Sequence, residues 1–232
     1  MSIIWRRLRY MLCPQADMYL HLVPLVHDKT VLEVGFGTGF GVLQYAVAAD
    51  KIDAIETDRD AVNWALESVP LANVRWLLRD ITAGPMDRQY DVVVAFEVLE
   101  HIDRWQAALC NIGRALAPGG VAYISRPNAN ADLRKNANHV EEWSAGRFAY
   151  ELSVYFNRVE LVDYTLVNRI GFDTTVTPMV ARVSQYKARQ YAMPNLVAKS
   201  YSSVDDAAKD VLNKDFDVMR KYINELFYGP TE

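Results

Sequence analysis

The sequence is short of cysteine, of long apolar runs and of any strong excess of charge. Only Cys13 and Cys110 are present among 232 residues, and they match no metal-binding spacing, so we expect reduced thiols in a cytoplasmic protein. No stretch approaches the roughly 20 apolar residues that cross a bilayer, so we expect no membrane span. The formal net charge of −4 argues against nucleic acid as a partner, although it leaves room for a local basic patch.

Between Thr30 and Phe172, short apolar runs alternate with amphipathic stretches, which is the pattern of βαβ units around a parallel sheet. The run from Val92 to Phe96 is typical of a central strand that is buried on both faces. Pro118-Gly119-Gly120 should end the helix that follows this strand. The expected strands are 31–34, 52–56, 74–78, 90–96, 121–125, 159–167 and 174–181, and the expected helices are 40–49, 60–68, 105–117 and 144–155.

The first strand runs into the turn Gly35-Phe36-Gly37-Thr38-Gly39. Glycines at this spacing allow positive φ angles and let a ligand approach the backbone. A dinucleotide site would need a sixth-position glycine, but Phe40 stands there. Glu33, just before the turn, would repel a pyrophosphate and suits a cationic ligand. The segment resembles motif I of the class I S-adenosylmethionine (SAM)-dependent methyltransferases.

Acidic residues follow the next two predicted strands. Glu56 ends the second strand, at about the distance from the glycines where a carboxylate binds ribose hydroxyls. Asp58 reads instead as the N-cap of the following helix. The resemblance implies that Asp80 accepts the adenine amino group and that Ile81 packs on the ring. The competing interpretation of Asp80 is a cap on the turn before Gly84.

The fourth strand ends in Glu97-Val98-Leu99-Glu100-His101, and the run from Leu116 to Asn128 also resembles the family. The resemblance extends from Thr30 to Val167 and implies a Rossmann-like, seven-stranded class I sheet with helices on both faces. It also implies that Gly35, Gly37 and Gly39 form the methionine pocket with Glu33, and that Glu97 lies near the cofactor. Glu97 and His101 are the candidate catalytic residues, and His101 is the candidate general base because imidazole suits proton transfer near neutral pH.

The same Glu-x-x-Glu-His cluster is a metal site in two related subgroups. Ubiquinone-pathway O-methyltransferases place Mg²⁺ on the two glutamates and the histidine, and small-RNA 3′-terminal 2′-O-methyltransferases add a second histidine. The resemblance therefore implies Glu97, Glu100, His101 and His139 as ligands of Mg²⁺ or Mn²⁺. The alternative is that both histidines make local structural contacts. The RNA subgroup's Asn-x-Glu-Tyr-Asn run is not reproduced in Arg126–Asn130.

We divide the chain into three parts. Residues 1–29 should cap the cofactor cleft, with binding to a membrane surface as the alternative. Residues 30–183 should bind SAM. Residues 184–232 should form an arm and a helix whose apolar stripe runs from Ala208 to Leu226 and packs on the domain or on a second copy in a homodimer. The family implies methyl transfer to a hydroxyl or amine of a small metabolite or glycan unit, or metal-assisted O-methylation of an RNA 3′ terminus or catechol-like ring.

Overall fold

The computed structural model describes residues 16–127, 140–141, 143–163 and 178–187. They form a seven-stranded sheet of order β3-β2-β1-β4-β5-β7-β6, in which β7 is antiparallel to both of its neighbours. This confirms the predicted α/β fold. The strands are β1 (Thr30–Val34), β2 (Lys51–Glu56), β3 (Val74–Leu78), β4 (Tyr90–Ala95), β5 (Leu116–Pro127), β6 (Phe156–Asp163) and β7 (Pro178–Tyr186). The helices are α2 (Ala16–Leu22), η1 (Val23–Leu25), α3 (Phe40–Tyr45), α4 (Arg59–Ser68), η2 (Leu99–His101), α5 (Trp105–Ala115) and α6 (Ala145–Tyr155).

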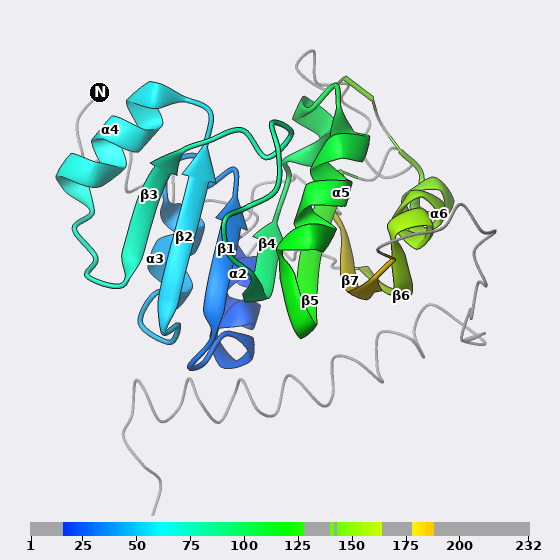
Figure 1. Ribbon diagram of the computed structural model, residues 1–232, viewed down its shortest axis with the longest axis horizontal. Coiled ribbons are helices and arrows are strands. Elements are labelled where there is room, and N and C mark those ends of the chain that lie inside the picture. Colours follow the sequence, from blue (N-terminus) through cyan, green and yellow to red (C-terminus); the bar gives the residue numbers. More distant parts are fainter. Residues whose placement is uncertain (1–15, 128–139, 142, 164–177, 188–232) are drawn as a thin grey trace, which may run out of the picture.

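Helices cover both faces of the sheet, as the sequence predicted (Figure 1). Met18 of α2, Val42 of α3 and Val62 of α4 belong to the core on one face. Ile112 of α5 and Phe148 of α6 belong to the core on the other face. Each helix turns an apolar stripe toward the sheet, and burial of those stripes supplies the main driving force for assembling the layers.

Strand β4 lies at the centre of the sheet and is buried on both faces. Val93 packs into the core with α5 and α6, whereas Val92 and Val94 pack into the core with α2, α3 and α4. Strand β1 pairs with β2 on one side and with β4 on the other. The strand order therefore reverses between β1 and β4, and such a reversal opens a crevice at the carboxyl ends of parallel strands.

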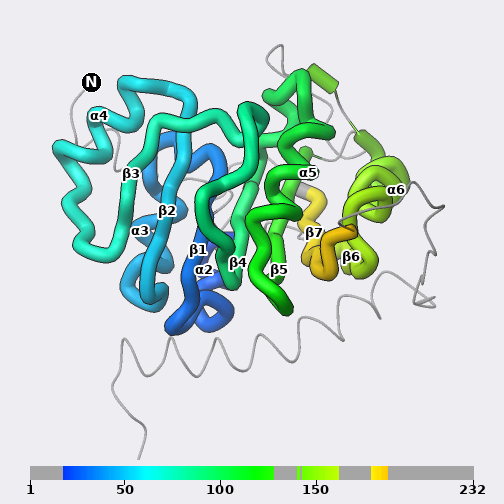
Figure 2. Tube along the Cα trace, in the orientation of Figure 1, coloured from blue at the N-terminus to red at the C-terminus, as the bar shows by residue number. Residues whose placement is uncertain are grey.

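The connection from β3 to β4, residues 79–89, contains no helix. Figure 2 shows it crossing the carboxyl ends of the strands and descending along the sheet to the start of β4. Beneath it, the buried carboxylate of Asp53 accepts hydrogen bonds from Arg75 at 2.6 Å and from the Tyr90 hydroxyl at 2.7 Å. These partners satisfy a charge that would otherwise be costly to bury in the middle of β2.

Several predicted boundaries are wrong. The fifth strand begins at Leu116, because that residue already has an extended backbone and pairs with Tyr90. Pro118-Gly119-Gly120 lies inside the strand, where the register shifts and Gly119 has a φ of +82°, so it marks a bulge instead of a helix end. Helix α3 ends at Tyr45, β6 begins at Phe156 instead of at residue 159, and β7 continues to Tyr186 instead of ending at residue 181.

The predicted flanking segments are only partly described. Residues 16–25 form α2 and η1, and the side chains of Met18, Leu22 and Val23 are buried in the core. Strand β7 continues to Tyr186, so the arm predicted from Ser184 does not begin there. Cys13 and the predicted C-terminal helix lie outside the described residues. No helix among the described residues combines the length and apolar character that crossing a bilayer requires.

Candidate active site

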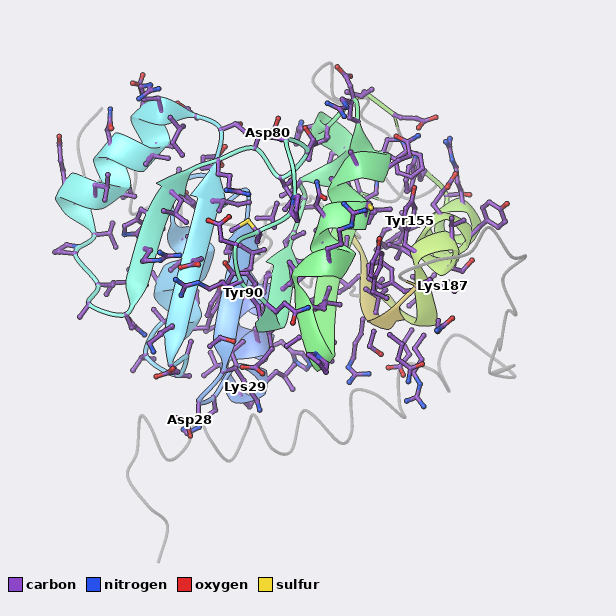
Figure 3. The ribbon with its side chains drawn as sticks, viewed as in Figure 1. Asp28, Lys29, Asp80, Tyr90, Tyr155 and Lys187 are labelled. Atoms are coloured by element: carbon purple, nitrogen blue, oxygen red, sulfur yellow. The ribbon has the colours of Figure 1, made fainter. Side chains whose placement is uncertain are left out.

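A cavity of about 620 Å³ opens at the carboxyl ends of the strands. Asp80, on its rim, lies at the end of the sheet opposite to Asp28 and Lys29, which precede β1 (Figure 3). The carboxyl-terminal ends of four neighbouring strands, and the residues just after them, contribute most of the wall: Val34, Gly35 and Gly37 at the end of β1, Glu56 and Thr57 at the end of β2, Arg79, Asp80, Ile81 and Thr82 after β3, and Glu97, Val98 and His101 after β4. The fold thus brings most of the predicted site residues to one cavity.

The glycine turn lines one side of this cavity. Gly35 has a φ of +71°, and a Cβ there would meet Val98 Cγ2 at 2.6 Å. Gly37 also has a positive φ, of +56°, but a Cβ there would meet nothing within 4 Å. Gly39 precedes α3 and lies outside the cavity wall, where a Cβ would meet the Trp76 ring at 3.1 Å. Two of the three glycines therefore face the site, and the third permits close packing behind it.

Glu56 closes the glycine turn from the neighbouring strand. Its Oε2 accepts a hydrogen bond from the Gly37 backbone N–H at 2.9 Å, and its Oε1 accepts from the Thr57 N–H at 2.7 Å. Asp58 caps α4 by accepting from the Asp60 N–H at 2.8 Å and from the Ala61 N–H at 3.4 Å. The N-cap interpretation of Asp58 is confirmed, and Glu56 is the carboxylate of this pair that lines the cavity.

Asp80 both stabilises a turn and lines the cavity. Its Oδ1 accepts from the Thr82 N–H at 2.7 Å and its Oδ2 accepts from the Thr82 hydroxyl at 2.9 Å, so it does stabilise a turn. It also lines the cavity beside Ile81, whose side chain is buried. The Asn111 side chain donates to the Ile81 carbonyl at 2.7 Å and fixes this turn on α5. The adenine role of Asp80 and Ile81 stays a prediction.

Glu33 lies beneath the glycine turn and not in the cavity wall. Glu33 is 1% exposed, and its carboxyl group accepts a hydrogen bond from the Tyr45 hydroxyl of α3. Burial raises the pKa of Glu33 to about 7, although hydrogen bonds from Tyr45 and Tyr19 act in the opposite direction. The sequence placed this carboxylate at the mouth of the turn, whereas β-strand alternation directs it toward α2 and α3.

Glu97 occupies a strained position at the end of β4. It is a non-glycine residue with a φ of +54°, a conformation that costs free energy and recurs at functional sites. Ser125 of β5 holds it twice, donating its hydroxyl to Oε1 at 2.7 Å and accepting from the Glu97 N–H at 3.0 Å. Burial, and then repulsion by Glu100, raise the pKa of Glu97 to about 8. His101 lines the same cavity and is exposed to solvent.

The sequence pointed to neither Ser125 nor Arg126 as a functional residue. Ser125 is fully buried and Arg126 is 1% exposed, and both lie near the carboxyl end of β5, at the edge of the sheet where ligands bind. The arginine at position 126, which follows an apolar run, could have indicated a functional role from the sequence, because a buried guanidinium needs a partner of opposite charge. Trp143, which is also fully buried, covers Arg126.

The metal set predicted from Glu97, Glu100, His101 and His139 does not form within the described part of the chain. No group of three or more histidine, cysteine, aspartate or glutamate side chains there is placed to hold a metal ion. Glu100 is 2% exposed and is absent from the cavity wall, whereas His101 is exposed on it. His139 lies outside the described residues. As they are placed, Glu97, Glu100 and His101 therefore do not form a binding site for a divalent cation within the described residues.

Comparison with known sequences identifies the family and several relatives. The model of a methyltransferase domain matches residues 4–175. A ubiquinone biosynthesis O-methyltransferase of Rickettsia bellii is 30% identical over 105 residues, covering 44% of this chain and 44% of its own length. A probable (S)-tetrahydroprotoberberine N-methyltransferase of Papaver bracteatum is 24% identical over 182 residues, covering 69% of this chain and 49% of its own. The chain thus spans about half the length of these curated relatives.

Solved structures show the same fold. The N-methyltransferase NodS from Bradyrhizobium japonicum, in complex with S-adenosyl-L-homocysteine, superposes with a TM-score of 0.60 and 18% sequence identity. The match covers 75% of this chain and 86% of NodS. A putative methyltransferase in complex with the Haloferax volcanii Trm112 activator gives a TM-score of 0.58 at 15% identity, over 73% of this chain and 88% of that one.

Proposed function

This chain belongs to the methyltransferase-domain family, and we propose that it transfers a methyl group from SAM to a hydroxyl or amine of a small metabolite or glycan unit. Its family membership makes it a SAM-dependent methyltransferase with the class I fold. The observation that carries the finer proposal is the shared cavity, which brings together Gly37, Glu56, Asp80, Glu97 and His101. Its volume of about 620 Å³ falls in the range of small-molecule sites.

The cavity suits a cationic cofactor. Four carboxylates line it, from Glu56, Asp80, Glu97 and Asp103, against the guanidinium groups of Arg79 and Arg104. Burial, followed by repulsion from Glu100, raises the pKa of Glu97 to about 8. A bound cation would favour the ionised carboxylate and would itself be stabilised in return. SAM supplies such positive charge on its ammonium and sulfonium groups, together with the methyl group to be transferred.

Different residues of the cavity would bind different parts of the cofactor. The open space above Gly37 admits the ligand close to the backbone. Glu56 presents a carboxylate, already oriented by the Gly37 N–H, to the ribose hydroxyls. Asp80 and Ile81 provide the adenine site, and Ser125 orients Glu97 toward the positively charged end. Fixed groups of this kind contribute to the rate by holding the reacting atoms in line.

The acceptor side of the cavity carries His101. Its imidazole is solvent-accessible beside Glu97, where it would accept the proton that an acceptor hydroxyl or ammonium loses as the methyl group arrives. Both acceptor atoms are represented among the relatives, because one is named as an O-methyltransferase and another as an N-methyltransferase. We therefore keep hydroxyl and amine acceptors together in the proposal.

The test is methyl transfer by the purified chain. Tritiated-methyl SAM would be supplied with panels of phenols, amines and oligosaccharides, beside His101→Ala. We expect transfer to at least one panel, and a fall in turnover of about 10²-fold or more in the variant with S-adenosylhomocysteine affinity unchanged. Normal turnover by His101→Ala would remove the histidine from the mechanism. Failure of the wild-type chain to bind S-adenosylhomocysteine, measured by calorimetry, would overturn the proposed function.

A further inference from the structure

Two oppositely charged side chains are buried behind the acceptor side of the cavity with unsatisfied polar atoms. Glu100 of η2 is 2% exposed and Arg126 of β5 is 1% exposed. Within the part of the chain that is described, Glu100 Oε2 and Arg126 Nε and Nη1 have no hydrogen-bond partner. Unpaired buried charges are costly, so each of these groups needs compensation from the other or from a ligand.

Arg126 is held firmly in place. Its Cζ lies 3.8 Å from the ring centroid of Trp143, and its Nη2 donates to the Glu141 carbonyl oxygen. Trp143 in turn packs edge-on against Trp105 of α5, with ring centroids 4.7 Å apart. Stacking on an indole face is favourable for a guanidinium and leaves its edge free for other interactions. Nε and Nη1 are the atoms of that edge that remain available.

Glu100 belongs to the same buried region. Its backbone carbonyl accepts a hydrogen bond from the Val140 N–H at 2.8 Å, which brings the segment before Trp143 against η2. Burial lowers the pKa of Arg126 to about 10, whereas the charges of Glu100, then of Glu141, and more weakly of Glu97 favour the protonated guanidinium. The positive charge of Arg126 in turn favours the ionised forms of both carboxylates. The guanidinium of Arg126 therefore acts electrostatically on both glutamates of the Glu-x-x-Glu pair, and it hydrogen-bonds to neither.

A guanidinium cannot be a metal ligand, because it has five N–H donors and no free lone pair. Its positive charge also repels a divalent cation at the glutamates that it compensates. We infer that Arg126 is the resident cation of the Glu97–Glu100 pair and occupies the electrostatic role that a divalent metal would otherwise have. Arg126 is thus a positioning residue, which stabilises Glu97 in its strained conformation at the cavity wall. The inference concerns the site of the proposed function but does not depend on the acceptor.

Mn²⁺ binding provides the first test. The full chain, loaded with S-adenosylhomocysteine, would be titrated with Mn²⁺ and followed by electron paramagnetic resonance, beside Glu97→Gln/Glu100→Gln. We expect the wild type to bind no Mn²⁺ at micromolar concentrations. Micromolar binding that disappears in the double variant would overturn the inference. Because this measurement needs no acceptor, it is independent of whether methyl transfer has been found.

A double-mutant cycle tests the pairing itself. Arg126→Met and Glu100→Gln each leave one buried charge without its partner, so each should lower Tm, by about 10 °C for Arg126→Met. The double variant removes both charges and should melt above Arg126→Met alone. Additive losses would contradict the pairing. Arg126→Lys keeps the positive charge and should recover part of the kcat that Arg126→Met loses. If Arg126 had a purely structural role, Arg126→Lys and Arg126→Met would have the same kcat whenever their Tm values were equal.

Discussion

Replacing Glu33 by glutamine should change how the stability of this protein depends on pH. Glutamine keeps an oxygen that can accept the hydrogen bond from the Tyr45 hydroxyl and has nearly the same volume, but it cannot ionise. Glu33 lies beneath the cofactor turn with 1% of its surface exposed. The substitution therefore isolates the free energy of burying one negative charge under α2 and α3.

The magnitude follows from the pKa. Burial raises the pKa of Glu33 from 4.5 to about 7 in the folded protein, so the folded state holds this proton more tightly than the unfolded state does. Stability consequently falls as pH rises from about 4.5 to about 7, and it is level above that range. The total loss corresponds to about 3 kcal/mol. Glu33→Gln should escape this loss and gain about that much relative to the wild type at pH 8.

Urea unfolding at pH 5, 6, 7 and 8, without cofactor, would measure the effect. Glu97 and Glu100 also have raised pKa values, so only the difference between variant and wild type is assigned to Glu33. Glu67→Gln, at an exposed position on α4, is the matched control and should follow the wild type at every pH. Parallel curves for Glu33→Gln and the wild type would show that the buried carboxyl group does not titrate as argued.

Two pairs of substitutions test the cavity wall. Glu56→Ala should weaken S-adenosylhomocysteine binding, measured by calorimetry, by 10-fold or more, because hydrogen bonds to a charged group contribute about 1.5–3 kcal/mol. The control Asp58→Ala removes only the N-cap of α4 and should leave the affinity unchanged. Equal affinities for the wild type and both variants would remove Glu56 from the cofactor site. Gly35→Ala should cost about 2–3 kcal/mol in urea unfolding through its positive φ and its contact with Val98. Gly37→Ala, with open space at its Cβ, should cost about 1 kcal/mol, and a loss equal to that of Gly35→Ala would contradict the steric argument.

The succession of strands and helices along the chain and the position of the cofactor turn could be predicted from the sequence because both depend on local patterns. Apolar runs of strand length and the glycines at 35, 37 and 39 specify backbone conformation within a few residues of themselves. The carboxyl ends of parallel strands share one edge, so Glu56, Asp80 and Glu97 could be assigned to one cavity from the strand pattern. The N-cap role of Asp58 was equally local, and the structure confirms it.

Tertiary structure alone decided the partners of the buried charges. The side chain of Glu33 meets Tyr45 because α3 folds back over β1, and Arg126 meets Trp143 because α5 and α6 pack on the same face of the sheet. The start of β5 at Leu116 likewise depends on pairing with Tyr90 across the sheet. Such contacts join residues far apart in the chain, and their electrostatic effect depends on burial that no local pattern encodes.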